Sequence, residues 1–114
     1  MTKDYFPSLI PNGSHIYYFD KETATAIKKQ YKEVNGNWYY FGPNWYALTG
    51  EQTIDGAHVY FHRDGKQAKG ELVTVNDKLH YYDPNSGART ENTTLTIEGK
   101  TYHFDAEGNG KLLN

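Results

Sequence analysis

The stretch Gln30-Tyr31-Lys32-Glu33-Val34-Asn35-Gly36-Asn37-Trp38-Tyr39-Tyr40-Phe41 decides how this chain folds. Its centre, Asn35-Gly36, is the strongest short-range hairpin signal, because both central positions of a two-residue type I′ turn need φ > 0, which Asn and Gly tolerate. Counting outward from this turn predicts five cross-strand pairs: Val34 with Asn37, Glu33 with Trp38, Lys32 with Tyr39, Tyr31 with Tyr40, and Gln30 with Phe41. The stretch is therefore predicted to form one β-hairpin.

The same pattern, a turn followed by an aromatic strand, recurs along the chain. The turn signals are Asn12-Gly13, Asn35-Gly36, Asp55-Gly56, Asn76-Asp77 and Glu98-Gly99. The last aromatic residue of each strand forms a column, Phe19, Phe41, Phe61, Tyr82 and Phe104, with steps of 22, 20, 21 and 22 residues. A period of this length indicates a repeat architecture.

A lone two-stranded hairpin is marginally stable in water, so such units must stack and bury their aromatic faces against one another. Each aromatic strand is followed by a second turn, and small residues come after four of these turns: Ala24, Ala47, Ala68 and Ala88. We therefore predict an all-β fold, a β-solenoid of stacked β-hairpins with about five repeats of 20–22 residues. The single domain 1–114 would contain hairpin units near 8–24, 28–47, 50–68, 71–88 and 93–110.

Two local features leave alternatives open. Residues 20–32 contain no Gly or Pro, which also permits a helix, although the repeat register places a strand inside this span. Residues 1–7 and 111–114 resemble parts of further units, which predicts that the chain was cut from a longer array or that its ends meet another copy, as a homodimer or end to end.

Composition excludes several classes of function. A formal net charge of -2 without a basic stripe argues against nucleic acid or an anionic membrane as partner. No apolar run approaches the roughly 18 residues of a membrane span, and the first residues lack the apolar core of a signal peptide. The chain has no Cys, which excludes disulfides and thiolate metal sites. Aromatic residues must supply most of the core.

Neither the histidines nor the aspartates predict a metal or catalytic site. His58 and His62 are four residues apart, and in a strand this spacing separates them by roughly 13 Å, too far for one ion. The acidic residues Asp20, Asp55, Asp64, Asp83 and Asp105 occupy turn positions, where Asp caps its own backbone. We therefore expect no metal, no cofactor and no enzymatic activity in this chain.

The hairpin of residues 30–41 is the best candidate for a binding site. Strand alternation places four of its side chains on one face: Gln30, Lys32, Tyr39 and Phe41. An amide, an ammonium group and an aromatic ring side by side suit a sugar, which needs a flat apolar platform with hydrogen-bonding groups at its edge. We expect Tyr39 to stack against a sugar ring while Gln30 and Lys32 bind its hydroxyls.

These repeats resemble the glucan-binding and cell wall binding repeats of bacterial glucansucrases and, more distantly, those of choline-binding proteins and clostridial toxins. The resemblance rests on the stretches 35–41, 47–50 and 54–70, and it extends from about residue 8 to the end. It implies stacked hairpins, a secreted or cell-surface bacterial protein without catalytic function, and an α-glucan (dextran-like, isomalto-type) as ligand. The alternative is a structural or protein-interaction array.

The resemblance also implies which residues bind sugar. Some glucan-binding repeats carry Gln, any residue, Lys, then six to eight residues, then Tyr-Tyr-Phe, and one hairpin here fits: Gln30, Lys32, Tyr39, Tyr40 and Phe41. A weaker second site departs from this spacing: Gln67, Lys69, Tyr60 and Tyr81. A repeated choline cage needs pairs of Trp, and the chain has only Trp38 and Trp45, so we expect no such cage.

Overall fold

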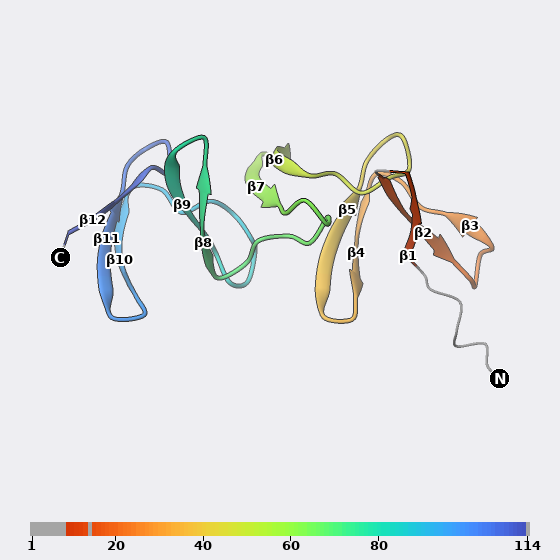
Figure 1. The fold of residues 1–114 in the computed structure, drawn as a ribbon, viewed down its shortest axis with the longest axis horizontal. Helices are drawn as coiled ribbons and strands as arrows, with labels where there is room; N and C mark the ends of the chain where they lie inside the picture. Colours follow the sequence, from red (N-terminus) through yellow and green to blue (C-terminus); the bar gives the residue numbers. More distant parts are fainter. Residues whose placement is uncertain (1–8, 14, 114) are drawn as a thin grey trace. The chain divides into compact units, whose positions relative to one another are not determined.

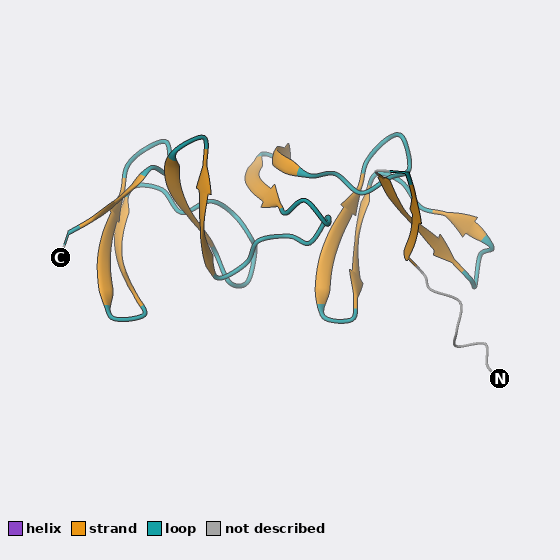
Figure 2. Ribbon diagram, in the orientation of Figure 1, coloured by secondary structure: helices purple, strands orange, loops and turns teal. Residues whose placement is uncertain are grey.

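The computed structural model describes residues 9–13 and 15–113, and this part of the chain is all-β. Figures 1 and 2 show its strands joined by turns and loops, with no helix in the described residues. The strands are β1 (Leu9–Asn12), β2 (His15–Asp20), β3 (Thr25–Ala26), β4 (Gln30–Val34), β5 (Asn37–Phe41), β6 (Gly50–Ile54), β7 (Ala57–Phe61), β8 (Glu71–Val75), β9 (Lys78–Tyr82), β10 (Thr93–Ile97), β11 (Lys100–Phe104) and β12 (Gly110–Leu112).

The predicted turns explain why adjacent strands pair as hairpins. Both turn residues have positive φ after β4, β6, β8 and β10: Asn35 and Gly36, Asp55 and Gly56, Asn76 and Asp77, and Glu98 and Gly99. These are the values that a type I′ turn requires, and they confirm the turn prediction at four sites. At the first hairpin the register differs by one residue, because Asn12 pairs with His15 and the loop therefore begins at Gly13.

The alternative of a helix over residues 20–32 is wrong. The short strand β3 pairs with β2 through Phe19 with Ala26 and Asp20 with Thr25. Ala24 and Lys29 both have positive φ, 59° and 56°, which a right-handed helix excludes. The segment thus forms a turn, a two-residue strand and a second bend before β4 begins.

The described chain divides into two compact units. The first contains residues 9–13, 15–52 and 61–67, and the second contains residues 53–60 and 68–113. The first unit includes the three-stranded sheet β1-β2-β3 and the β4–β5 hairpin. The second includes a five-stranded sheet in the order β10-β11-β12-β9-β8. The predicted partial unit at residues 1–7 lies outside the described residues.

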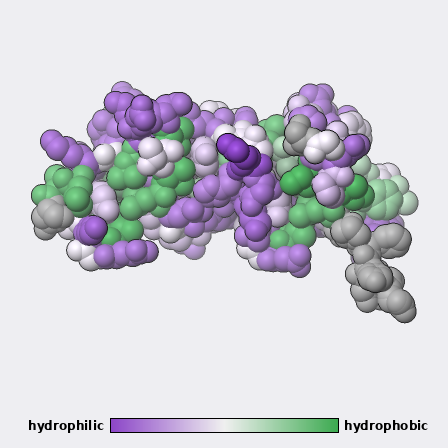
Figure 3. All heavy atoms as spheres, viewed as in Figure 1, coloured by the Kyte–Doolittle hydropathy of each residue, from purple (hydrophilic) through white to green (hydrophobic). Residues whose placement is uncertain are grey.

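Aromatic rings form the core of each unit. In the first unit Tyr39, Phe41, Ile27 and Ala47 are buried together, with side chains from β1 and β2 packed against them. In the second unit the aromatic core includes Tyr82, Tyr102 and Phe104. On the face drawn in Figure 3, hydrophilic atoms cover the tips of the β4–β5 and β10–β11 hairpins. Of the aromatic column, only Phe19 in the first hairpin is exposed, at 38%.

Within each unit, the segment after a hairpin bonds back to an earlier hairpin. In the first unit the Ala47 N–H donates to the Ile16 carbonyl and the Gln67 N–H to the Trp38 carbonyl, at 2.7 and 2.8 Å. In the second unit the Arg89 N–H donates to the His58 carbonyl at 2.8 Å. We call these three hydrogen bonds the back-bonds. They satisfy backbone groups that an isolated hairpin would leave to water.

No helix that could span a membrane occurs in the described residues.

Candidate functional site

The β4–β5 hairpin has the register that its turn dictates. Gln30 pairs with Phe41, Lys32 with Tyr39 and Val34 with Asn37, and the two intervening pairs are Tyr31 with Tyr40 and Glu33 with Trp38. All five predicted pairs are therefore confirmed. Because side chains alternate between the faces of a hairpin, Gln30, Lys32, Tyr39 and Phe41 lie on one face and Tyr40 lies on the other.

The aromatic residues of the predicted site are largely buried. Tyr39 is 4% exposed and Phe41 is 0% exposed, and their rings stack with centroids 6.2 Å apart. A Cβ added at Gly65 would lie 3.1 Å from the Tyr39 ring, so the 61–67 segment also covers it. Burial, and to a lesser extent the Asp64 carboxylate, raise the pKa of Tyr39. Tyr39 thus belongs to the core of its unit, and its ring packs beneath the hairpin.

The polar residues of the same face are more accessible. Gln30 is exposed, and Lys32 is half-buried with its ammonium group 5.3 Å from the centroid of the Tyr18 ring. Such an arrangement is a cation–π contact, which holds the ammonium group in place while its donors remain available. The structure therefore brings Gln30 and Lys32 to the surface above a buried aromatic floor.

The opposite face carries a second aromatic group. Tyr31 packs edge-on against Tyr40 at 4.9 Å and against Trp38 at 6.4 Å, and all three are half-buried. Tyr31 also lies 6.4 Å from Phe61 of the same unit. Tyr40 is therefore separated by the hairpin backbone from the other four predicted residues.

The weaker predicted site is divided between the units. Gln67 belongs to the first unit, where its side chain is 92% buried and its Nε2 atom has no hydrogen-bond partner. Tyr60, Lys69 and Tyr81 belong to the second. There, Lys69 donates to the Asn85 carbonyl at 3.2 Å and Tyr60 stacks on Tyr82 at 5.9 Å. Within their own units, these residues have structural contacts.

The turn after β5 presents an aromatic residue that the sequence patterns above did not identify. Trp45 is 40% exposed, its φ is 77°, and the Lys28 ammonium group lies 4.6 Å from the centroid of its ring. Gly65, Gly87 and Gly108 hold the left-handed position in the following turns. Aligning these turns on the preceding aromatic residue would have shown that Trp45 stands where Gly65 and Gly108 stand in their turns.

Four of the five turn aspartates cap their own backbone, as predicted. Asp20, Asp64, Asp83 and Asp105 each accept at least one hydrogen bond from a backbone N–H two to four residues later. The backbone N–H groups of Ser86 and Asn85 hold the pKa of Asp83 below its usual range. Asp55 instead has the left-handed first position of its two-residue turn, with φ of 53°. The aspartates thus have structural roles.

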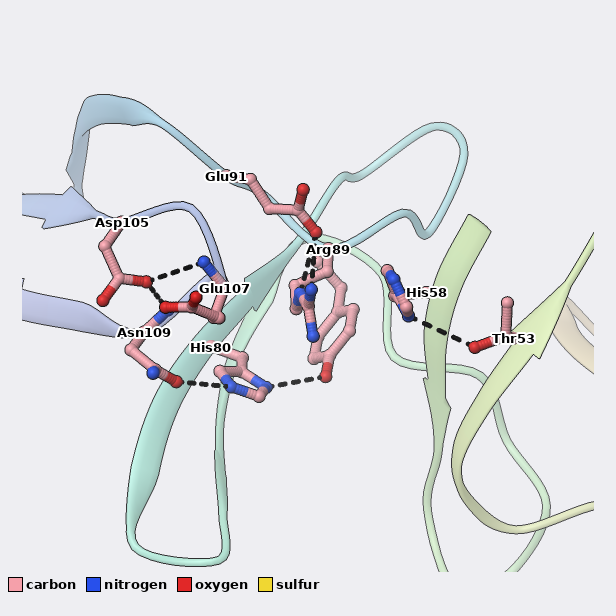
Figure 4. Close-up of polar contacts among 9 residues, drawn as sticks. Thr53, His58, His80, Arg89, Glu91, Asp105, Glu107 and Asn109 are labelled. Carbon is pink, nitrogen blue, oxygen red and sulfur yellow. Dashed lines mark hydrogen bonds and ion pairs between the residues drawn. The ribbon is translucent and has the colours of Figure 1, made fainter. Parts of the chain in front are cut away.

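Three histidines in the second unit make side-chain hydrogen bonds, and Figure 4 shows two of them, His58 and His80. The third, His103, has Nδ1 2.9 Å from the Thr94 hydroxyl. His80 is buried, with Nδ1 3.1 Å from the Tyr82 hydroxyl and Nε2 3.1 Å from Asn109 Oδ1. His58 Nδ1 lies 3.2 Å from the Thr53 hydroxyl. Among the described residues, no group of three or more His, Asp or Glu side chains could hold a metal ion.

The second unit also has an open cavity of about 330 Å³ beside the start of β8 and the β10–β11 turn. Its lining mixes apolar and charged side chains: Leu72, Ile97 and Tyr102 with Glu71, Glu98 and Lys100, along with Gly70. Its composition does not favour one class of ligand over another.

Comparison with known sequences assigns the repeats to a recognised type. Residues 48–93 match the choline-binding repeat, and residues 29–44 match the putative cell wall binding repeat. The chain is 45% identical over 71 residues to glucosyltransferase-S of Streptococcus mutans serotype c, a match that covers 62% of this chain. The chain spans only 5% of the length of that relative.

Comparison with solved structures gives the same type of fold. Choline binding protein F from Streptococcus pneumoniae matches 91% of this chain with a TM-score of 0.73 and 24% identity, and the match covers 35% of that chain. Alternansucrase in complex with isomaltononaose matches 94% of this chain with a TM-score of 0.54 and 28% identity, over 12% of its own chain. The first likeness concerns the fold alone, whereas the second also extends to sequence.

Proposed function

We propose that this chain, whose repeats are of the choline-binding and cell wall binding type, is a non-catalytic module that binds α-glucan. The observation that carries the proposal is the β4–β5 hairpin, where Gln30 and Lys32 stand at the surface on the face whose buried floor is Tyr39 and Phe41. The similarity to streptococcal glucosyltransferases and to an alternansucrase bound to isomaltononaose supports a dextran-like, isomalto-type ligand.

In the proposed site, Gln30 and Lys32 donate hydrogen bonds to sugar hydroxyls. Tyr39 and Phe41 are buried, so we do not expect them to stack on the sugar. We propose instead that their rings pack beneath the strand and support it. Tyr40, on the opposite face, would hold the hairpin through its contact with Tyr31. A site with few hydroxyl contacts binds weakly, because each hydrogen bond to sugar replaces one to water. Useful strength would come from several contacts along one polymer.

We further propose that the hairpin units near 8–24, 28–47, 50–68, 71–88 and 93–110 continue as one stacked β-solenoid of a secreted or cell-surface bacterial protein. The back-bonds support stacking, because each joins the segment after one hairpin to an earlier hairpin. End-to-end association or a homodimer would extend the number of glucan contacts.

Affinity electrophoresis in a gel containing dextran tests the proposal. We expect the chain to be retarded by dextran, and calorimetry with isomaltotriose to show weak binding that falls several-fold in Gln30→Ala and Lys32→Ala. Lys66→Ala, which removes an exposed ammonium group in an ion pair with Asp64, serves as the matched control and should bind normally.

Normal migration of the wild-type chain in dextran would contradict the proposal and favour a structural or protein-interaction array. Choline provides a second comparison, since residues 48–93 match the choline-binding repeat. Both Trp residues lie outside that segment, so we expect choline to leave the migration unchanged.

A further inference from the structure

Trp45 has a backbone conformation that its residue type disfavours. Its φ is 77°, and the Trp45 N–H donates to the Gly42 carbonyl at 3.1 Å. Gly65 and Gly108 make the same bond to the residue three positions earlier, with φ of 88° and 79°. Glycine adopts this region freely, whereas the Cβ of a bulky residue makes it costly. The turn therefore carries strain that the related turns avoid.

Trp45 combines this strain with an open ring surface. The residue is 40% exposed, so part of the indole remains available to a ligand although the rest is packed. The Lys28 ammonium group lies 4.6 Å from the centroid of its ring. Strained backbone conformations cluster at binding and active sites, where they position a group for a ligand.

Two neighbouring polar groups lie at the same end of the hairpin. The Lys29 and Trp45 N–H groups both donate to the Gly42 carbonyl, at 3.4 and 3.1 Å, which joins the Lys28 segment to the Trp45 turn. Gln30 follows directly and pairs with Phe41, the residue before Gly42. The exposed indole and ammonium groups are therefore in contact at the end of the hairpin opposite its Asn35-Gly36 tip, and the exposed Gln30 follows Lys28 by two residues at the same end.

We propose that Trp45 is a stacking platform for a glucosyl ring, and that Lys28 and Gln30 bind the hydroxyls of that ring. The inference rests on the proposed function and extends the site along β4, from Lys32 through Gln30 to the turn. One face of a glucopyranose ring presents C–H groups that pack on an aromatic surface, while its rim of hydroxyls accepts hydrogen bonds from amide and ammonium donors. The exposed turn thereby adds contact with a second sugar of the same polymer.

The Trp45→Gly variant separates binding from folding, because it restores the residue that the related turns carry. We expect the variant to fold, because relief of the backbone strain offsets part of the lost packing, while its retardation by dextran falls several-fold. Trp45→Phe, which keeps a smaller ring, should lie between the two. Phe19→Ala removes another exposed aromatic residue of the first unit, 38% exposed, and should leave retardation unchanged.

Tryptophan fluorescence keeps the test decisive if Trp45→Gly folds less well. The chain has two Trp residues, so a Trp38→Phe variant reports on Trp45 alone. Isomaltotriose should shift the emission of this variant to shorter wavelength as the ring is covered. Dextran retardation of Trp45→Gly equal to the wild type, or emission that isomaltotriose leaves unchanged while the wild type is retarded, would overturn this inference and leave the glucan-binding proposal intact. A wild-type chain that dextran does not retard would overturn both.

Discussion

The turn after β5 and the turn after β9 each place a residue at nearly the same positive φ, with different side chains. Trp45 has φ of 77° in the first turn, and Gly87 has φ of 78° in the second. The second turn begins with Asp83, which accepts hydrogen bonds from the Asn85 and Ser86 N–H groups at 2.8 Å, whereas Gly42 begins the first. The turn after β9 is thus stabilised by the side chain of its own first residue. The turn after β5 begins with a glycine, which has no such side chain, and contains a Trp at a φ that disfavours it. We infer that its surroundings maintain the first turn, and under the proposal above its side chain contacts the glucan.

The largest loss of stability is expected when the buried aromatic ring that precedes either turn is removed. Phe41 precedes the first turn and is 0% exposed, and Tyr82 precedes the second and is 1% exposed. Replacing either by Ala should lower the free energy of unfolding by about 3–5 kcal/mol, because a large buried ring leaves a cavity. Urea unfolding followed by circular dichroism measures both variants. A much smaller loss for Phe41→Ala would show that the first turn does not depend on the core.

A smaller loss of stability is expected when a side chain is added at Gly87, in the turn after β9. Gly87→Ala introduces a Cβ at positive φ, which should cost about 1–2 kcal/mol. Trp45→Ala keeps a Cβ at the same φ, so its backbone strain should not change. Thermal unfolding of the two variants compares them directly. A Gly87→Ala variant as stable as the wild type would mean that a Cβ at this φ carries no cost in this turn.

Loss of the ammonium group over Trp45 should have a smaller effect. Lys28→Met removes a surface cation–π contact and should cost about 0.5–1 kcal/mol. Lys66→Met removes an exposed ion pair with Asp64, whose atoms are 3.9 Å apart, and should cost less. Denaturant midpoints of the two variants measure the difference. A Lys28→Met variant as stable as the wild type would show that the cation–π contact does not stabilise the turn.

The smallest expected effect is a dependence of stability on pH, which the turn after β9 should show through Asp83. Because the pKa of Asp83 is lowered in the folded chain, its contribution to stability is present above the ordinary Asp pKa and is lost as the pH falls through the folded value. Asp83→Asn should therefore be less stable than the wild type at pH 6, and the difference should shrink below about pH 4. Thermal unfolding across this range measures it. A constant difference would show that the capping bonds do not favour the ionised form.

The sequence predicts the hairpins well because their information is local. Asn35-Gly36 sets the turn type, and the turn type alone fixes every pair from Val34–Asn37 to Gln30–Phe41. The repeat register places a strand within residues 20–32, but the helix alternative stays open in the sequence because no short-range signal reveals the positive φ values of Ala24 and Lys29 that exclude it. Local patterns therefore determine pairing, whereas irregular connections depend on their neighbours.

The predicted site is harder to read from the sequence because burial is set by distant segments. Alternation correctly places Tyr39 beside Lys32, yet Tyr39 is covered by Ala47 and by the segment containing Gly65, which follow it by 8 and 26 residues. Nothing within the hairpin itself shows that this ring is covered. Trp45, in contrast, stands out once the turns are aligned, since it has a positive φ where the turns at Gly65 and Gly108 have glycine.

The back-bonds have a consequence for how such a chain can change in length during evolution. Each one joins positions about 30 residues apart, from Ala47 to Ile16, Gln67 to Trp38 and Arg89 to His58. Insertion of a single residue in a connecting segment would shift donor and acceptor out of register, whereas gain or loss of a whole hairpin with its turn would give every donor an equivalent acceptor. Duplication and deletion in whole units should therefore be tolerated, which would allow the number of ligand contacts to vary without redesign of the core.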